Sequence, residues 1–289
     1  MGWVSIDYDK CTDCGLCVLR CDRCFTQLKD TVTVQADANC CNLCGHCVSL
    51  CPTGAIVHSK MDMDNFPEIH EPVAFQPDEF IQFIRERRSH RHFRSERIPK
   101  KRLEQLIDAV RYAPTGSNDQ NVEIIVVENP ERMRRLSALT VEHFVRAGVS
   151  YAEHLERVRK GEEEAPDNVS MMEKVVKYRE RMLCARKQGL DPIFYNAPAV
   201  IIFHASIHGT TPRDNCVIAS TTMGLLARTM GLETTYIGLL EIAARSYQPL
   251  IDELSLPKGN QVFSVLIAGY PTLRYLRAID RRPIKTRWE

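Results

Sequence analysis

Two cysteine runs near the start of the chain constrain its structure more than any other feature. Both have the spacing C-x2-C-x2-C-x3-C, and they comprise Cys11, Cys14, Cys17 and Cys21, then Cys41, Cys44, Cys47 and Cys51. Ten of the twelve cysteines lie within residues 11–51, and only Cys184 and Cys216 lie beyond them. The sequence therefore predicts two chemically different parts, a cysteine-rich head and a much longer remainder.

Length and composition suit a small domain followed by a larger one, because 289 residues are too many for one ordinary domain. An apolar content of 44% and a net charge of +1, from 38 basic and 37 acidic residues, are ordinary for a globular protein. This balance favours neither nucleic acid nor a membrane surface as a partner. No apolar run approaches the about 20 residues of a membrane span, and the first residues lack a secretory signal pattern. We therefore expect a reducing, cytoplasmic location, in which cysteines are thiolate ligands rather than disulfides.

The cysteine spacing favours two [4Fe–4S] clusters. Three thiolates on a tight loop can bind three corners of a cubane, and the fourth cysteine, on a short helix, points at the other cluster. By this rule one cluster is bound by Cys11, Cys14, Cys17 and Cys51, and the other by Cys41, Cys44, Cys47 and Cys21. Gly15 and Gly45 occupy equivalent places, where the backbone approaches inorganic sulfide closely. Between the runs, residues 32–38 alternate like a short strand.

Residues from about 4 to 58 resemble a bacterial two-cluster ferredoxin, and the resemblance implies an electron-transfer domain. A structural zinc site needs two pairs of ligands rather than two sets of four, and disulfides do not suit the expected compartment. Cys24 and Cys40 exceed the eight ligands, and buried packing is the favoured interpretation of both. Asp22 stands where a proline often follows the fourth cysteine, and Cys24 is an alternative to Cys21 as a ligand.

A linker at residues 59–77 is expected to separate a domain at 1–58 from a larger domain at 78–289. The linker contains three regularly spaced prolines, Pro67, Pro72 and Pro77. Because proline removes a backbone donor and disfavours helix in the residue before it, we predict an extended connector. Phe66 and Phe75 are expected to pin this connector to the larger domain.

The larger domain alternates helical patterns with buried strands. One helix is expected to begin at Asp78 as its N-cap, and an apolar stripe within residues 100–113 predicts a second. Continuous apolar runs predict buried strands, and a helix rich in small residues is expected between the last two. The strands cover residues 122–128, 197–205 and 262–270, and the helix covers 213–232. The predicted fold class is α+β, in the form of an α/β sandwich.

Four segments of this domain, taken in order, resemble the FMN-dependent nitroreductase family. They are RRSHRHF at 87–93, APTGSNDQ at 113–120, GLETTYIG at 231–238, and AGYP followed by DRRP within 268–283. The resemblance covers roughly residues 78–289 and implies a nitroreductase-type FMN-binding sandwich behind the ferredoxin-like iron–sulfur domain. It also implies an obligate homodimer with FMN at the subunit interface.

The chemistry of FMN and the resemblance together predict several cofactor-binding residues. A dianionic phosphate needs forked donors and a hydroxyl, which Arg87, Arg88 and Ser89 supply. Arg91 is expected one helical turn further along the same face. In the family this position holds a cation near the pyrimidine edge of the flavin, where reduced flavin carries negative charge.

Further FMN contacts are implied by the family resemblance. The segment of the family that matches residues 114–118 comes from the opposite subunit, and it implies contacts by Pro114, Thr115, Gly116 and Asn118. The main-chain amide of Gly238 matches the position that faces flavin N5, and a glycine permits that approach. Arg281 and Arg282 match the basic residue that reaches back to the phosphate. No side chain is predicted to be catalytic.

The predicted function is an oxidoreductase in which electrons pass through the two clusters and FMN to a small organic acceptor, such as a nitroaromatic or a quinone. The donor is expected to be ferredoxin-like or NAD(P)H, although the sequence has no GxGxxG fingerprint after a strand. Alternative acceptors are an enone, a halogenated ring or free flavin. A non-catalytic alternative is an electron-relay module for a partner protein. Residues 140–195 are interpreted either as a lid or as part of the core.

Overall fold

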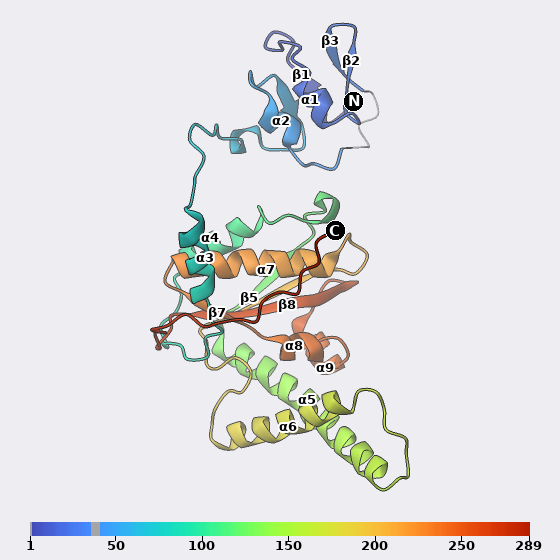
Figure 1. Ribbon diagram of the computed structural model, residues 1–289, viewed down its shortest axis with the longest axis vertical. Coiled ribbons are helices and arrows are strands. Elements are labelled where there is room, and N and C mark those ends of the chain that lie inside the picture. Colours follow the sequence, from blue (N-terminus) through green and yellow to red (C-terminus); the bar gives the residue numbers. More distant parts are fainter. Residues whose placement is uncertain (1, 36–40) are drawn as a thin grey trace. The chain divides into compact units, whose positions relative to one another are not determined.

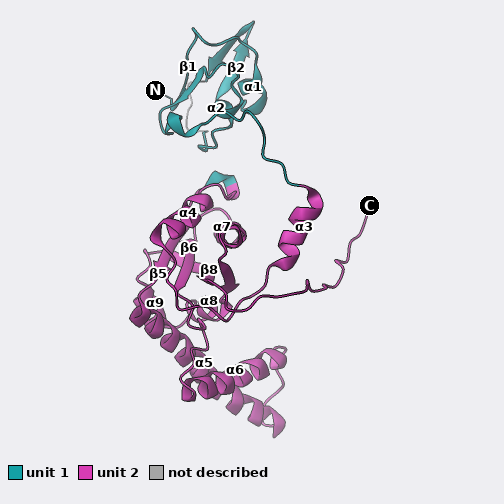
Figure 2. Cartoon of the chain, turned by 90° about the vertical axis from the view of Figure 1, so that its left-hand side faces the viewer, with its two compact units in different colours: residues 1–75, 117–119 teal, residues 76–116, 120–289 magenta. Residues whose placement is uncertain are grey.

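The computed structural model describes residues 2–35 and 41–289, and these divide into two compact units (Figure 2). The smaller unit comprises Met1–Phe75 with Ser117–Asp119, and the larger comprises Gln76–Gly116 with Gln120–Glu289. Cys40 and the last part of the predicted strand at 32–38 lie outside the described residues.

The smaller unit is built from short strands and two five-residue helices (Figure 1). Its elements are β1 (Val4–Ile6), α1 (Leu16–Arg20), β2 (Phe25–Leu28), β3 (Thr31–Val34), α2 (His46–Leu50), β4 (Ile56–His58) and the 3-10 turn η2 (Met63–Asn65). Strand β1 pairs antiparallel with β4, and β2 pairs antiparallel with β3. The apolar side chains that these pairs bury pack directly against the cysteines, because Val4, Phe25, Val32 and Ile56 share one cluster with them.

The two cysteine runs have the same loop conformation. Gly15 and Gly45 cap α1 and α2 with φ of 72° and 70°, in the left-handed region that glycine adopts without a steric penalty. Two positions earlier, Asp13 and Leu43 also have positive φ, at 51° and 58°. A Cβ on Gly45 would lie 3.1 Å from the ring of Phe66. Phe66 therefore packs within the smaller unit, and the expectation that it pins the linker to the larger domain is wrong.

The larger unit contains a sheet in the order β5-β6-β8-β7, in which every neighbouring pair is antiparallel. Its strands are β5 (Glu123–Val127), β6 (Ala199–Ser206), β7 (Glu233–Tyr236) and β8 (Asn260–Gly269). Three of them match the strands that the continuous apolar runs predict. The pairing of Val127 with Val200, and of Val200 with Ile267, places β6 between two neighbours, so that its backbone groups are satisfied on both edges.

Helices cover both faces of this sheet (Figure 1). One face packs against α4 (Lys100–Val110) and α7 (Pro212–Thr229), and the other against α5 (Pro130–Arg159), α8 (Gly238–Ala243) and α9 (Gln248–Leu254). Strand β6 contributes alternate residues to the two cores: Ile201 and Phe203 face α4 and α7, whereas Val200 and Ile202 face α5, α8 and α9. The α/β sandwich predicted from the sequence is confirmed.

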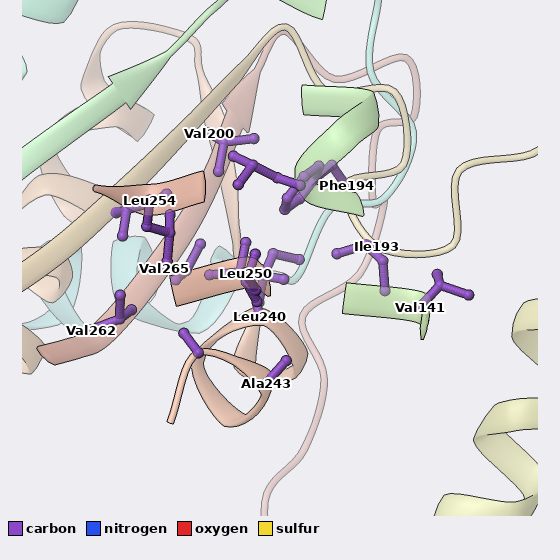
Figure 3. Packing of buried hydrophobic residues seen from close by; sticks show 14 of the residues in the cluster. Val141, Ile193, Phe194, Val200, Leu240, Ala243, Leu250, Leu254, Val262 and Val265 are labelled. Carbon is purple, nitrogen blue, oxygen red and sulfur yellow. The ribbon is translucent and has the colours of Figure 1, made fainter. Parts of the chain in front are cut away.

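Figure 3 shows how the second of these cores is filled. Leu240 on α8 and Leu250 and Leu254 on α9 lie with Val262 and Val265 of β8. All five side chains are almost completely buried. At about 25 cal/mol per Å² of apolar surface, such burial is the main force that holds α8 and α9 on the sheet.

Helix α3 (Pro77–Glu86) differs from the predicted helix at both ends. Gln76 is its N-cap and Pro77 opens its first turn, where the missing N–H has no cost; the prediction of Asp78 as N-cap is therefore wrong. Arg87 caps the C-terminus in an extended conformation, and the residues after it are not helical. The expectation that Arg91 lies one helical turn further along the same face is wrong for this reason.

Residues 140–195 form the end of α5, all of α6 (Val169–Lys187) and the connection to β6 (Figure 1). Phe144, Met172 and Phe194 are buried and belong to the core, whereas Met171 and Tyr178 are exposed. The segment is thus partly core and partly surface. No helix among the described residues is both long enough and apolar enough to cross a membrane.

We expect Leu106→Ala to destabilise the larger unit by about 2–5 kcal/mol, because Leu106 on α4 is 0% exposed and its loss leaves a cavity. Ile107→Ala is the matched control, since Ile107 is the next residue on the same helix but is 37% exposed. Urea unfolding of the full chain, followed by circular dichroism, measures both. Equal losses for the two variants would contradict the packing described for α4.

Candidate functional site

The first predicted set of cluster ligands is brought together in the structure. Cys11, Cys14, Cys17 and Cys51 line one cavity, whose apolar wall includes Val32, Ala55 and Ile56. The Sγ atom of Cys51 accepts the main-chain N–H of Ala55 at 3.2 Å. Burial alone would raise the pKa of Cys51, but N–H donors from Thr53, Ala55 and Ile56 outweigh it and lower the pKa. The site therefore favours a thiolate at Cys51, the form in which cysteine binds metal.

The other ligands of the second set, Cys21, Cys41 and Cys44, lie close to the buried Cys47, and the surplus cysteine Cys24 packs in the same cluster. Cys24 is also buried, and its thiol is hydrogen-bonded to Cys21 and Cys41. Burial, followed by these hydrogen bonds, raises the pKa of Cys24 to about 12. Packing beside the ligands accounts for this position, and the choice between Cys21 and Cys24 as the fourth ligand stays a prediction.

Across the described residues, no three His, Cys, Asp or Glu side chains converge closely enough to share one metal ion. A four-iron cluster does not require such convergence, because each thiolate binds a different corner of the cubane. The cysteines lie around a cavity rather than around a point, which is the arrangement that a cluster needs.

The first and last FMN-related segments run side by side in the larger unit. The N–H of Arg94 donates to the carbonyl oxygen of Tyr270 at 2.8 Å, and the N–H of Thr272 donates to that of His92 at 3.1 Å. A Cβ on Gly269 would lie 2.6 Å from Pro198 Cδ and 2.8 Å from the ring of Phe93. The close approach of these segments thus requires a glycine at position 269.

The third segment contacts the first. The hydroxyl of Thr235 on β7 donates to the carbonyl oxygen of His90. Gly238 is the first residue of α8, separated from β7 by Ile237, and a Cβ there would meet no other part of the chain within 4 Å. The backbone at Gly238 is therefore open to an approaching group. The first and last segments thus meet at the end of β7 and β8 where Glu233 pairs with Gly269, and Thr235 joins them there, whereas Gly238 lies beyond the opposite end of β7.

The predicted phosphate-binding residues differ in how far they are exposed to solvent. Arg87 is half-buried and Ser89 is exposed, so both can meet a ligand. Arg88 is buried: its Nη1 donates to the carbonyl oxygens of Arg85 and Arg87 at 2.6 and 2.7 Å. The Nε and Nη2 atoms of Arg88 are buried without a hydrogen-bond partner among the described residues. A buried guanidinium with unused donors stabilises an anion close by.

A buried charge cluster that the sequence did not reveal lies beside Arg88. Arg228 on α7 is 3.4 Å from Glu86 and 3.6 Å from Glu233, and the imidazole of His90 is 3.7 Å from Glu233. Burial raises the pKa of Glu233, opposed by Arg228 and the arginines of the first segment. Burial, then Arg228 and Arg88, lowers the pKa of His90.

The same charge cluster lines a groove of about 960 Å³ between α3 and residues 271–278. The charged residues of this cluster lie up to about 150 residues apart in the sequence, and the ion pairs of Arg228 on α7 with Glu86 on α3 and Glu233 on β7 bring them together. Arg281 and Arg282 lie further along the exposed tail, and neither contributes to the lining of this groove.

Arg91 lies over the ring of Tyr195, with its guanidinium carbon 5.6 Å from the ring centre. The contact is a cation–π interaction at an exposed site, where it contributes about 0.5–1 kcal/mol. It connects the first segment to the residues that precede β6.

The second FMN-related segment is held by a buried asparagine. Asn215 on α7 accepts the N–H of Gly116 at 2.9 Å and donates to the carbonyl oxygen of Thr210 at 2.7 Å and to Asn121 at 3.0 Å. A Cβ on Gly116 would collide with Thr211. The loop at 114–116 therefore depends on a residue about 100 positions away, which the sequence analysis missed.

The remaining residues of this segment are also accounted for. Thr115 accepts the N–H of Gln120 at 3.0 Å, and Pro114 precedes it in the turn that follows α4. Asn118 belongs to the smaller unit, where its side-chain amide donates to the carbonyl oxygens of Asn42 and Leu43, each at 2.9 Å.

We expect Asn215→Ala to loosen this loop, because it removes the acceptor of the Gly116 N–H, at a cost of about 1–3 kcal/mol. Hydrogen exchange of the Gly116 amide should become faster. Asn121→Ala is the control, since Asn121 accepts from Nδ2 of Asn215, whereas the Gly116 N–H is bound by Oδ1. Unchanged exchange at Gly116 in Asn215→Ala would show that another group holds the loop.

Comparison with known proteins agrees with both parts of the chain. A model of the Nitroreductase family matches residues 84–270, which is more than half of the chain. An FMN reductase [NAD(P)H] of Bacillus subtilis (strain 168) is 36% identical over 62 residues, which are 22% of this chain and 25% of that protein. A ferredoxin of Methanothermococcus thermolithotrophicus is 40% identical over 55 residues, which are 18% of this chain and 92% of that protein.

Among solved structures, a nitroreductase with bound FMN from Desulfitobacterium hafniense DCB-2 superposes with a TM-score of 0.52 and 21% identity. The match covers 73% of this chain and 98% of that one, and it shows the same fold. The chain spans about a quarter of the length of the FMN reductase that it matches. Together, the matched family model and the ferredoxin relative establish that this chain belongs to the nitroreductase family and carries a ferredoxin-related N-terminal part.

Proposed function

We propose that this protein is an oxidoreductase that passes electrons through two [4Fe–4S] clusters and FMN to a small organic acceptor, such as a nitroaromatic or a quinone. The observation that carries the proposal is that one chain contains both a cavity lined by four cysteines and three FMN-related segments that are hydrogen-bonded to one another along β7 and β8. A ferredoxin relative and a family whose solved members include one with bound FMN support the same two cofactors.

The residues of the smaller unit fit two clusters. Cys11, Cys14, Cys17 and Cys51 would hold the first, in the cavity that they line. Cys41, Cys44, Cys47 and Cys21 would hold the second. Each loop contains two residues with positive φ, a conformation that can form anion-binding concavities and suits sulfur atoms that carry negative charge.

The residues of the larger unit fit FMN. Arg87 and Ser89 would bind the phosphate, with the buried charge of Arg88 behind them and Arg281 and Arg282 reaching it from the tail. Arg91 would place its charge near the pyrimidine edge of the ring, and the open backbone at Gly238 would face N5. When bound, the clusters carry single electrons and the flavin collects two for delivery to the acceptor.

We further propose a homodimer in which Pro114, Thr115, Gly116 and Asn118 contact the FMN of the other subunit. Apolar side chains that the single chain leaves exposed support a partner of this kind. They include Ile81 and Ile84 on α3, and Leu276, Ile284 and Trp288 in the tail. Such a set of exposed apolar residues is typical of a protein–protein interface.

We propose a ferredoxin-like protein or NAD(P)H as the electron donor. Reduction of an enone, a halogenated ring or free flavin would use the same residues, because these hold the cofactor rather than the acceptor. A relay of electrons to a partner protein is the non-catalytic alternative. The two alternatives differ in access, since a small acceptor must reach the flavin, whereas a relay works with the flavin covered.

Anaerobic reduction of the purified protein, followed by EPR and visible spectra on one sample, tests this function. We expect about eight iron atoms per chain, a flavin spectrum, and reoxidation of both kinds of centre when a nitroaromatic is added. If both centres are reduced but neither small acceptors nor free flavin reoxidise them, the relay is the better account. Zinc in place of iron, or a protein without flavin, would refute the proposal.

Arg87→Gln should weaken FMN binding about 10- to 100-fold, because a hydrogen bond to a charged group contributes about 1.5–3 kcal/mol. Fluorescence titration of the flavin-free protein with FMN measures the affinity. Lys100→Gln is the matched control, as this exposed cation on α4 pairs with Glu104, four residues later on the same helix. An unchanged affinity for Arg87→Gln would remove this residue from the phosphate site.

A further inference from the structure

His58, the last residue of β4, is buried against a predicted cluster ligand. Its side chain lies in the ferredoxin-related unit with only 1% of the residue exposed, and its Nε2 is 3.4 Å from the Sγ atom of Cys41. The antiparallel pairing of His58 with Val4 of β1 fixes the backbone at this point. The imidazole therefore has a defined position beside one sulfur atom.

The hydrogen bonds of the ring determine which nitrogen carries the proton. The main-chain N–H of Lys60 donates to Nδ1 of His58 at 3.2 Å, so Nδ1 is an acceptor and carries no proton. In an imidazole with a bare Nδ1, the proton is on Nε2. Nε2 is therefore a donor, and the group that it faces is the sulfur of Cys41.

The two cysteine runs are repeats, and at three pairs of equivalent positions one repeat has a polar residue where the other has a leucine. His58 lies seven residues after Cys51, and the residue seven after Cys21 is Leu28, which is 61% exposed. A leucine in one repeat also corresponds to a basic residue in the other at two more positions: Leu16 corresponds to His46, and Leu50 corresponds to Arg20.

These three polar residues all adjoin the same predicted ligand set. His46 lies between Cys44 and Cys47, Arg20 directly precedes Cys21, and the two side chains are hydrogen-bonded to each other. The corresponding leucines, Leu16 and Leu50, adjoin the ligands of the other set. At these positions the imidazole and guanidinium groups therefore lie beside the Cys41 set and leucines beside the Cys11 set, whose Cys51 is bonded instead by the main-chain N–H of Ala55.

We infer that His58 is a positioning residue that donates a hydrogen bond to Cys41 and gives the cluster bound by Cys41, Cys44, Cys47 and Cys21 the higher reduction potential of the two. The inference rests on the proposed function, since it requires both clusters. Reduction adds one electron from an external donor, forms and breaks no bond, and leaves the proton on Nε2. The electron makes the cluster with its four thiolates more negative, from −2 to −3, so a donor to sulfur stabilises the reduced form more.

The consequence is a preferred resting place for a single electron within the smaller unit. An electron that enters at either cluster moves to the one with the higher potential, and hydrogen bonds to the sulfur atoms are among the features that set it. Repeats of identical spacing would otherwise tend to give two centres of similar potential.

The test is an EPR-monitored redox titration of the full chain, purified without oxygen. In His58→Leu, at a fixed ambient potential, the reduced-to-oxidised ratio of the higher-potential cluster should fall about tenfold, a shift of about 59 mV for one electron. The lower-potential cluster should not shift. His58→Gln, whose amide can donate to the sulfur, should recover part of the change. His70→Leu is the matched control, because this histidine of the same unit is 82% exposed.

Iron and sulfide analysis of each sample separates the possible failures. If His58→Leu contains all of its iron and titrates like the wild-type protein, the inference is wrong while the proposed function stands. If the wild-type protein lacks one or both clusters, both are wrong. If His58→Leu cannot be loaded, His58→Phe, which keeps an aromatic ring without a donor, decides: the higher potential should fall, and an unchanged potential would overturn the inference.

Discussion

Burial of strand β6 on both of its faces is the constraint on which the larger unit depends. Val200 and Ile202 enter one core and Ile201 and Phe203 the other, so helices must cover both sides of the sheet. Antiparallel partners on both edges satisfy its backbone groups. With β6 and β8 fixed in this way, the ends of β7 and β8 have defined positions, and the FMN-related segments are attached to those ends.

Glycines in the FMN-related segments then allow these segments to pack closely against the rest of the larger unit. Gly269 has no room for a Cβ beside Phe93 and Pro198, and Gly116 has none beside Thr211. At Gly238 the opposite holds, because the space beside the backbone is open. The glycines of these segments therefore serve different purposes: two allow chain segments to pack together, and one leaves space in which a ligand can approach.

The sequence predicted the parts of the structure that depend on local pattern. Continuous apolar runs identified β5, β6 and β8, because a strand buried on both faces has no polar alternation. The repeated glycines identified the equivalent cysteine loops, which share the same φ values. Predictions failed where local signals compete. Pro77 began α3 ahead of the expected cap Asp78, and the helix ended at Glu86, so Arg91 does not lie on it.

Residue types and spacing by themselves determined that this protein has a cysteine-rich ferredoxin-related part followed by a sandwich of the nitroreductase family, and they predicted two sets of four cysteine ligands and a flavin-phosphate site. The tertiary structure alone decided which distant groups meet. Asn215 reaches Gly116, Arg228 reaches Glu86 and Glu233, and His58 reaches Cys41. The physical reason is that the spacing of residues in the sequence determines only which side chains lie close together within one strand, loop or helix turn. Contacts between elements depend instead on how buried faces pack, and that packing is settled only when the whole core forms.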